Sequence, residues 1–190
     1  MNALQRKEAH MEQIITIRDA DLTYQARNGE VEALRGVTFS VAEGEFVSIV
    51  GPSGCGKSTL LGVLAGLETL DGGTAALRGS AISGPNRLVG FMPQRDQLFE
   101  WRTIRDNVML GLELRRDRDP VHRRHAEALL ARYGLAEFAD KRPDQLSGGM
   151  RQRCALIRTL ATGPDILLLD EPFSALDYQT RLAVSGDIWR

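Results

Sequence analysis

A glycine-rich turn at residues 51–59, with the sequence GPSGCGKST, constrains this chain more than any other feature. The apolar run at 46–50 predicts a buried strand directly before the turn, and the apolar-periodic stretch from Lys57 onward predicts a helix after it. A strand, a glycine-rich turn and a helix in this order match the pattern of a phosphate-binding loop. The turn therefore predicts a binding site for a nucleoside triphosphate.

Each part of the turn has a chemical role in the predicted site. The glycines allow backbone N–H groups to point inward as a concave anion site, and the start of the helix adds the positive end of its dipole. Lys57 should reach the β- and γ-phosphates, and the hydroxyl of Ser58 should bind Mg²⁺. The nucleotide ligands predicted in the turn are Gly51, Ser53, Gly54, Cys55, Gly56, Lys57, Ser58 and Thr59.

Two acidic residues further along the chain suit the same chemistry. The apolar run at 166–169 ends in Asp170 and Glu171, which predicts a parallel strand, buried on both faces, with two carboxylates at its C-terminal end. Asp170 is suited to contact Mg²⁺, directly or through water, and Glu171 to polarise an attacking water. The alternative is that the two acids cap a helix.

The segments around these motifs predict an α/β fold. Residues 14–22 and 37–50 have short, β-branched and partly alternating patterns, which favour antiparallel strands that lead into the turn. Residues 88–92 predict a further strand, followed closely by Gln94. The strand set thus places the phosphate loop and Gln94 directly after strands.

The second half of the chain has helical periodicity. Residues 103–133 are interpreted as two helices rather than one, because Pro120 interrupts a charged stretch. Residues 146–161 predict a third helix. Its apolar positions on one face are Met150, Cys154, Ile157 and Leu160 or Ala161.

Composition narrows the class of protein further. With 24 basic and 25 acidic residues the formal net charge is −1, which gives no general attraction to nucleic acid. Cys55 and Cys154 lack metal-ligand spacing, so reduced thiols are expected. The N-terminal residues have no signal-peptide core, and no apolar run approaches the roughly 18 residues of a membrane span. A membrane would be reached through a partner.

The stretch LSGGMRQR at 146–153 resembles the signature of the ABC (ATP-binding cassette) ATPase family, whose usual form is LSGGQ. Ser147 can cap the following helix while Gly148 and Gly149 expose backbone N–H groups, so that the helix start forms a second anion site. The resemblance implies a head-to-tail homodimer, in which each ATP lies between the phosphate loop of one copy and this turn of the other. Met150 replaces the usual glutamine.

Three further positions match the family in order. The resemblance implies that Gln94 contacts Mg²⁺ and senses the γ-phosphate, that residues 174–177 lie across the dimer interface, and that Tyr24 stacks on adenine. A lone aromatic residue such as Tyr24 can instead belong to the core. The implied catalytic residues are Glu171, Gln94 and Lys57, and the implied magnesium ligands are Ser58, Gln94 and Asp170.

The resemblance also implies the architecture. It predicts a P-loop NTPase (RecA-like) α/β core with an N-terminal antiparallel β layer and an inserted helical subdomain. An ABC ATPase domain is expected over 12–190, after an N-terminal extension at 1–11. Its nucleotide-binding core would comprise 12–94 and 151–190, and its helical signature subdomain 95–150.

The segment FMPQRDQLFEWRTIRDNVMLGLELR at 91–115 looks like the nitrate, sulfonate and taurine importer ATPases. The partners implied are integral membrane permease subunits and a solute-binding protein, with the chain at the cytoplasmic face of the membrane. Leu98, Phe99 and Trp101 look exposed and lie where family members receive the coupling helix of the membrane subunit. Trp101 would suit such an interface, and its burial in the helical subdomain is the alternative.

The chain departs from the family near its C-terminal end. Family members carry a switch histidine after the strand that follows 174–177, whereas the histidines of this chain are His10, His122 and His125. The chain is therefore interpreted as C-terminally truncated, as a fragment of a longer protein rather than the alternative of a naturally shortened one, and weakened ATP turnover is expected. Two other functions stay open: a soluble ABC ATPase without a transport role, and a hydrolysis-deficient nucleotide-binding fragment.

Overall fold

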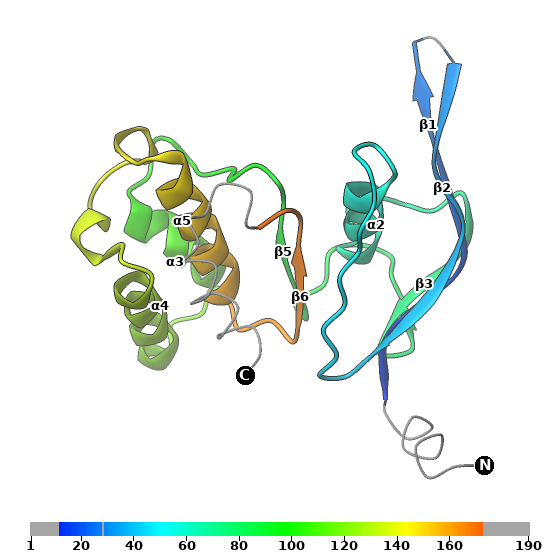
Figure 1. Ribbon diagram of the computed structural model, residues 1–190. Helices are drawn as coiled ribbons and strands as arrows, with labels where there is room; N and C mark the ends of the chain where they lie inside the picture. The colour runs from blue at the N-terminus through cyan, green and yellow to red at the C-terminus, as the bar shows by residue number, and fades with distance from the viewer. Residues whose placement is uncertain (1–11, 28, 173–190) are drawn as a thin grey trace. The chain divides into compact units, whose positions relative to one another are not determined.

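The computed structural model describes residues 12–27 and 29–172. These residues fall into two compact units that divide between Asn86 and Arg87. The first unit is built on an antiparallel sheet, and the second combines two parallel strands with a group of helices (Figure 1). Among the described residues, no helix has both the length and the apolar character that crossing a membrane requires.

The sheet of the first unit has the strand order β2-β1-β3-β4. Its long hairpin joins β1 (Gln13–Ala26) to β2 (Gly29–Ala42), and β3 (Gly72–Leu77) pairs antiparallel with the other side of β1, with β4 (Ser80–Ala81) at the edge. Alternating residues of β1 are buried because successive side chains of a strand point to opposite faces. The antiparallel layer predicted from the sequence is thus present.

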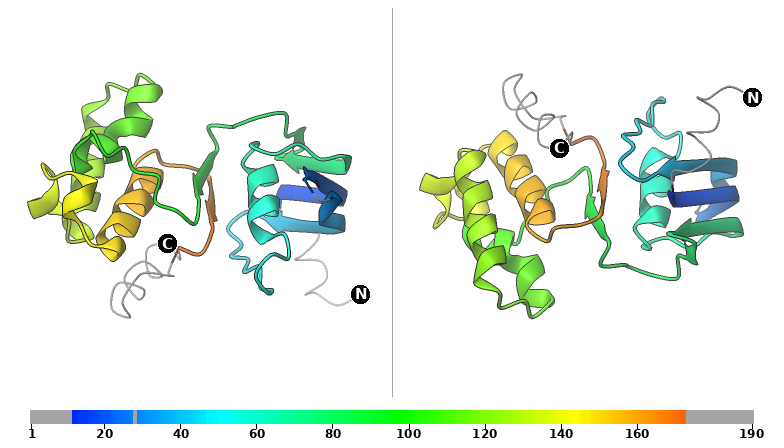
Figure 2. Two further views of the ribbon diagram at one scale, coloured as in Figure 1. Left: turned by 90° about the horizontal axis from the view of Figure 1, so that it is seen from above. Right: turned by 90° about the horizontal axis from the view of Figure 1, so that it is seen from below.

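One helix, α2 (Lys57–Leu64), contacts β2 and β3. Figure 2 shows this helix against the sheet from above and from below. Its contribution to the core of the unit comes from four apolar side chains, each of which stabilises the fold by about 1.5–3 kcal/mol when fully buried. These are Leu60, Leu61, Val63 and Leu64. The helix predicted to begin at Lys57 is confirmed.

The buried strand predicted at 46–50 is wrong for this structure. Neither sheet of the described residues contains this segment, and β2 ends at Ala42. The side chain of Val50 is 89% exposed, and those of Phe46, Val47 and Ile49 are also exposed. An apolar run indicates that a segment suits a strand, but it does not indicate which strand it pairs with. The parallel strands in the described residues belong to the other unit.

The second unit contains β5 (Val89–Met92) paired in parallel with β6 (Ile166–Leu169). Both strands were predicted, and so was the parallel direction of β6. Burial on both faces of β6 is wrong: Ile166 and Leu168 are buried, whereas the alternate residues are only partly covered. A continuous apolar run indicates a buried strand, but it does not indicate how completely each face is covered by the layers packed on it.

Helices accompany the two strands in the described part of the second unit. They are α3 (Ile104–Leu114), α4 (Pro120–Arg132) and α5 (Gly148–Leu160), with single 3₁₀ turns η1 (Ala136–Phe138) and η2 (Pro143–Gln145) between the last two. The three helices share one hydrophobic core. Its fully covered members include Ile104, Val108, Ala126, Leu130, Leu135, Cys154, Leu156 and Ile157.

Helix caps account for where these helices begin. The hydroxyl of Thr103 accepts a hydrogen bond from the N–H of Asp106, and the carboxylate of Asp119 accepts one from Val121. Pro120 is the first residue of α4, where its missing N–H costs nothing. The two helices predicted on either side of Pro120 are confirmed, and so is the helix predicted at 146–161, within two residues of its ends.

Candidate functional site

The glycine-rich turn at 51–59 lies on the surface of the first unit, with residues 51–55 exposed. Gly56 precedes the first helical residue of α2 with a φ of 91°, a conformation that favours glycine. A Cβ at Gly56 would lie only 2.2 Å from the carbonyl oxygen of Ala33 in β2. The turn is therefore seated directly on the β2 backbone, and only glycine fits at this contact.

The ammonium group of Lys57 lies folded over the turn. Its Nζ donates to the carbonyl oxygens of Gly51 at 2.8 Å and Pro52 at 2.7 Å, and it lies 3.6 Å from the Sγ of Cys55. These carbonyls hold a positive charge at the mouth of the turn. Because the turn is exposed, an incoming phosphate can take over these interactions without displacing buried groups.

Two other predicted ligands belong to the same unit. Ser58 is the second residue of α2 and is exposed, so its hydroxyl is open to a ligand. Tyr24 lies on β1 opposite Val31. Its side chain is 38% exposed, so it does not belong to the buried core. Stacking of Tyr24 on adenine stays a prediction.

A second group of predicted residues gathers where β5 and β6 end. The N–H of Asp170 donates to the carbonyl oxygen of Met92 at 2.9 Å, which extends the ladder by one residue beyond β6. Asp170 is buried, with 6% of its surface exposed. The carboxyl ends of parallel strands are where ligands of α/β proteins usually bind. Asp170 is thus held rigidly at the expected edge.

Gln94 and Glu171 meet at this same edge. The Nε2 of Gln94 donates to the Oε2 of Glu171 at 2.8 Å, although the residues are far apart in sequence. Glu171 has a φ of 49°, which is uncommon for a residue with a Cβ and turns the chain sharply after β6. Both side chains are exposed and can reach a ligand. Two of the three predicted catalytic residues are therefore in direct contact.

The signature turn, residues 146–149, has the predicted cap geometry. Ser147 is the N-cap of α5, and its Oγ accepts from the N–H of Met150 at 3.3 Å. Leu146 is buried, whereas Ser147 and Gly148 are exposed. The turn therefore presents open N–H groups at a helix start, the geometry that binds anions. Met150 packs against the hydrophobic core, which explains why an apolar residue is tolerated in place of glutamine.

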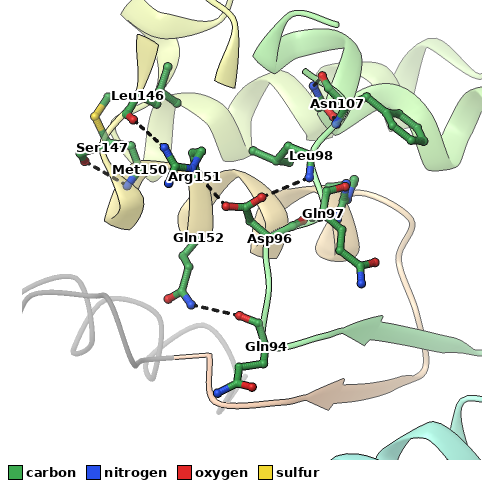
Figure 3. Close-up of polar contacts among 12 residues, drawn as sticks. Gln94, Asp96, Gln97, Leu98, Asn107, Leu146, Ser147, Met150, Arg151 and Gln152 are labelled. Carbon is green, nitrogen blue, oxygen red and sulfur yellow. Dashed lines mark hydrogen bonds and ion pairs between the residues drawn. The ribbon is translucent and has the colours of Figure 1, made fainter. Parts of the chain in front are cut away.

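The segment after Gln94 is bonded to α5 (Figure 3). The Oδ2 of Asp96 accepts from the Nε of Arg151 at 3.1 Å, and its Oδ1 accepts from the N–H of Leu98 at 3.2 Å. The guanidinium of Arg158 donates to the carbonyl oxygens of Asp96 and Gln97 at 2.7 and 2.8 Å. Burial lowers the pKa of Arg158. The helix that begins at the signature turn thus holds this segment in place.

Residues 99–103 are held by α3 instead. Asn107 is fully buried, and its Oδ1 accepts from the N–H of Phe99 while its Nδ2 donates to the carbonyl oxygens of Phe99 and Thr103. The ring of Trp101 stacks on Phe99 with centroids 4.8 Å apart and remains 70% exposed. Burial of Trp101 is therefore wrong. The expected exposure of Leu98 is also wrong, because Leu98 packs into the helical core.

The structure thus brings some predicted residues together and leaves others untested. Gln94, Asp170 and Glu171 share the edge of the second unit, whereas Ser58 belongs to the first, so a joint magnesium site stays a prediction. Residues 174–177 lie outside the described part of the chain. Within that part, no three His, Cys, Asp or Glu side chains are grouped closely enough to hold a metal ion.

Comparison with known proteins decides the family. A family model described as ABC transporter matches residues 34–174, more than half of the chain. The chain belongs to the ABC transporter family. The matched residues include the glycine-rich turn, the signature turn and the carboxylate edge, which are the three features that carried the resemblance at the level of sequence.

Several relatives are named as import proteins. The taurine import ATP-binding protein of Ruegeria pomeroyi is 42% identical over 173 residues, 90% of this chain and 65% of that protein. The aliphatic sulfonates import ATP-binding protein of Agrobacterium fabrum is 50% identical over 151 residues, 80% of this chain and 56% of that protein. This chain thus spans less than two thirds of the length of these relatives.

Solved structures of ABC proteins have the same fold. The dimeric ATP-binding cassette MJ0796, bound to ADP and Pi after hydrolysis, matches with a TM-score of 0.81 at 32% identity, over 90% of this chain and 80% of that one. A bacterial Atm1-family exporter with ATP bound matches with a TM-score of 0.78 at 30% identity, over 93% of this chain and 32% of that one. The predicted fold class is confirmed.

Sequence reasoning missed the residues that connect α5 to the segment after Gln94. Asp96 lies in a charged loop and carries no motif, so its partner could not be identified. Arg151 and Arg158 did offer a signal, since they are seven residues apart and lie on the same face of α5. Two arginines on one face of a helix whose apolar face is buried indicate that both contact the same neighbouring segment.

Proposed function

We propose that this chain binds ATP with Mg²⁺, pairs with a second copy, and hydrolyses ATP to drive solute import through a membrane permease. The geometry of the exposed turn at 51–59 carries the proposal. It offers backbone amides, a helix start and the Lys57 ammonium within one short exposed segment. This combination suits the polyphosphate of a nucleotide better than any uncharged ligand.

The residues present fit a magnesium ion. Ser58, Gln94 and Asp170 supply a hydroxyl, an amide and a carboxylate, which are oxygen donors of the kind that Mg²⁺ prefers. Only one of the three is charged, in keeping with a cation that takes its other ligands from phosphates and water. When bound, the ion would neutralise charge that develops on the phosphate oxygens.

Glu171 would orient the attacking water and accept its proton. Its Oε2 accepts a hydrogen bond from Gln94, so this carboxylate oxygen must exchange its partner before it can hold water. Gln94 would then be free to contact the γ-phosphate region. Asp170 stays fixed throughout, because its backbone belongs to the ladder with β5.

The signature turn would complete the site of a second copy. Ser147 and Gly148 are exposed at the start of α5, and their geometry suits a phosphate that is also bound by the glycine-rich turn of the second copy. The likeness to a dimeric cassette bound to ADP and Pi supports a homodimer. We therefore propose that the dimer binds two nucleotides, one at each of two equivalent sites between the copies.

Import through a permease is supported by the names of the relatives and by one surface feature. The taurine and aliphatic sulfonates proteins are import ATP-binding proteins. Trp101 is exposed and stacked on Phe99, a rigid aromatic pair suited to a protein interface. The chain would thus lie at the cytoplasmic face of the membrane, with a permease, a solute-binding protein and a small sulfonate-like solute as partners.

Binding and hydrolysis of ATP can be tested with one substitution. Lys57→Ala should weaken ATP binding roughly 30-fold, because a charged hydrogen bond of about 2 kcal/mol is lost, and should abolish phosphate release. Lys141→Ala, at an exposed lysine of the second unit, is the matched control and should behave like the unaltered chain. Equal ATP affinity in the two variants would contradict the proposed site.

A further inference from the structure

The side chain of Arg151 connects the signature turn to the segment after Gln94. Its Nη1 donates to the carbonyl oxygen of Leu146 at 3.1 Å, directly before Ser147. Its Nη2 lies 4.0 Å from the place that a Cβ on Gly148 would occupy. One guanidinium therefore lies against the backbone on both sides of Ser147, the central residue of the turn.

Asp96 fixes the direction of this guanidinium. An arginine has a long, flexible side chain, and holding it in one orientation requires a rigid acceptor. Asp96 is such an acceptor because its carbonyl oxygen is held by Arg158 and its carboxylate is also bonded to the N–H of Leu98. The side chains of Asp96 and Arg151 are 27% and 35% exposed, so their attraction is only partly screened by water.

We propose that Asp96 and Arg151 form a positioning pair, which shapes the signature turn for the phosphate of a second copy and links that turn to Gln94. The link arises because Asp96 follows Gln94 by two residues. Arg151 bonds both Asp96 and Leu146, so a phosphate bound at the signature turn and a ligand bound at Gln94 would act on the same short segment (Figure 3). Neither side chain touches the reaction. The inference rests on the proposed function, in which the turn meets a nucleotide held by another copy.

The pair can be tested in the full chain by separating two events, ATP binding to one copy and association of two copies. Both are measured in a Glu171→Gln background, where ATP persists. Sedimentation velocity gives the dimer dissociation constant with ATP and Mg²⁺, and a fluorescent nucleotide gives binding to the single chain. Asp96→Asn keeps the shape of the side chain and an acceptor for Leu98 while removing the charge.

Asp96→Asn and Arg151→Gln should each raise the dimer dissociation constant roughly tenfold, while single-chain ATP affinity stays unchanged and each variant stays folded under the conditions of the measurement. The double variant should be no weaker than Arg151→Gln, because the two side chains act through one contact. Asp140→Asn is the matched control, since it also removes a carboxylate that contacts an arginine, Arg105. It should leave association unchanged.

Three results would overturn the inference. Unaltered association in Asp96→Asn means that the pair does not shape the turn. A loss of stability or single-chain ATP binding that accounts for the weaker association means that the pair is only structural. If two copies with intact Asp96 do not associate at all in the presence of ATP, the proposed function fails and this inference fails with it.

Discussion

The two cysteines lie in opposite surroundings, and this difference can report on nucleotide binding. Cys55 is exposed in the glycine-rich turn, with its Sγ 3.6 Å from the Nζ of Lys57. Cys154 is fully buried beside α3, and burial raises the pKa of its thiol to about 12. Only the Cys55 thiol can therefore react with an alkylating reagent in the folded chain.

Iodoacetamide at pH 8 should modify one thiol per folded chain, and the modified residue should be Cys55. ATP at a hundred times its dissociation constant should slow the reaction about a hundredfold, because only about 1% of the chains then have an open turn. Mass spectrometry of the intact chain measures the number of modified thiols and the rate, and mass spectrometry of its peptides identifies the modified residue. At the same ATP concentration Lys57→Ala should reduce the protection to about fourfold, because its affinity is roughly 30-fold weaker. Protection that stays near a hundredfold in this variant would argue against binding at the turn.

Asn107 shows how one buried side chain can hold the loop that carries Trp101. Asn107→Leu keeps the volume but leaves the N–H of Phe99 without its partner and removes the side-chain bonds to the carbonyl oxygens of Phe99 and Thr103, which keep their backbone donors. The free energy of unfolding should fall by about 2–4 kcal/mol, measured with urea. Thr159→Val removes only a hydroxyl bonded within α5 and should cost about 1 kcal/mol. Similar losses in the two variants would refute this role for Asn107.

At the scale of elements, sequence signals that are local in the chain proved reliable. Ser147 caps a helix as predicted, and the run at 166–169 forms the predicted parallel strand. The strand predicted at 46–50 failed because pairing depends on a distant segment rather than on local pattern. The ion pair of Asp96 and Arg151 was invisible for the same reason, since 55 residues separate its members.

The two capped helices provide a matched pair of variants. Ser147→Ala and Thr103→Ala each remove one side-chain cap, so each should lower the free energy of unfolding by about 1 kcal/mol. Only Ser147→Ala should also weaken association of two copies with ATP, because only this cap lies in the signature turn. Urea unfolding and sedimentation velocity measure the two effects. Equal association of the variants would mean that the turn has no role beyond capping.

At the scale of the whole molecule, Trp101 offers a test of the proposed permease interface. Trp101→Ala should leave ATP affinity and stability unchanged, because the ring is 70% exposed, but should cost about 2 kcal/mol of binding to a permease. Co-purification with a co-expressed permease subunit measures the loss. Leu114→Ala, at another exposed apolar residue, is the control. Normal co-purification of Trp101→Ala would exclude this interface.

The signature turn of one copy should meet the nucleotide of another, and Gly148 allows the most direct measurement of this contact. Gly148→Glu should fold well, since only Arg151 lies near the added Cβ and a helix start favours a negative charge. The same charge should repel a phosphate, whereas Gly148→Gln carries none and serves as the control.

Sedimentation velocity of Glu171→Gln with ATP and Mg²⁺ should give a dimer, and the added Gly148→Glu substitution should give a monomer that still binds ATP. The added Gly148→Gln substitution should retain at least partial dimerisation. A Glu171→Gln chain that stays monomeric at saturating ATP would contradict the account. So would a Gly148→Glu variant that dimerises as readily as its parent.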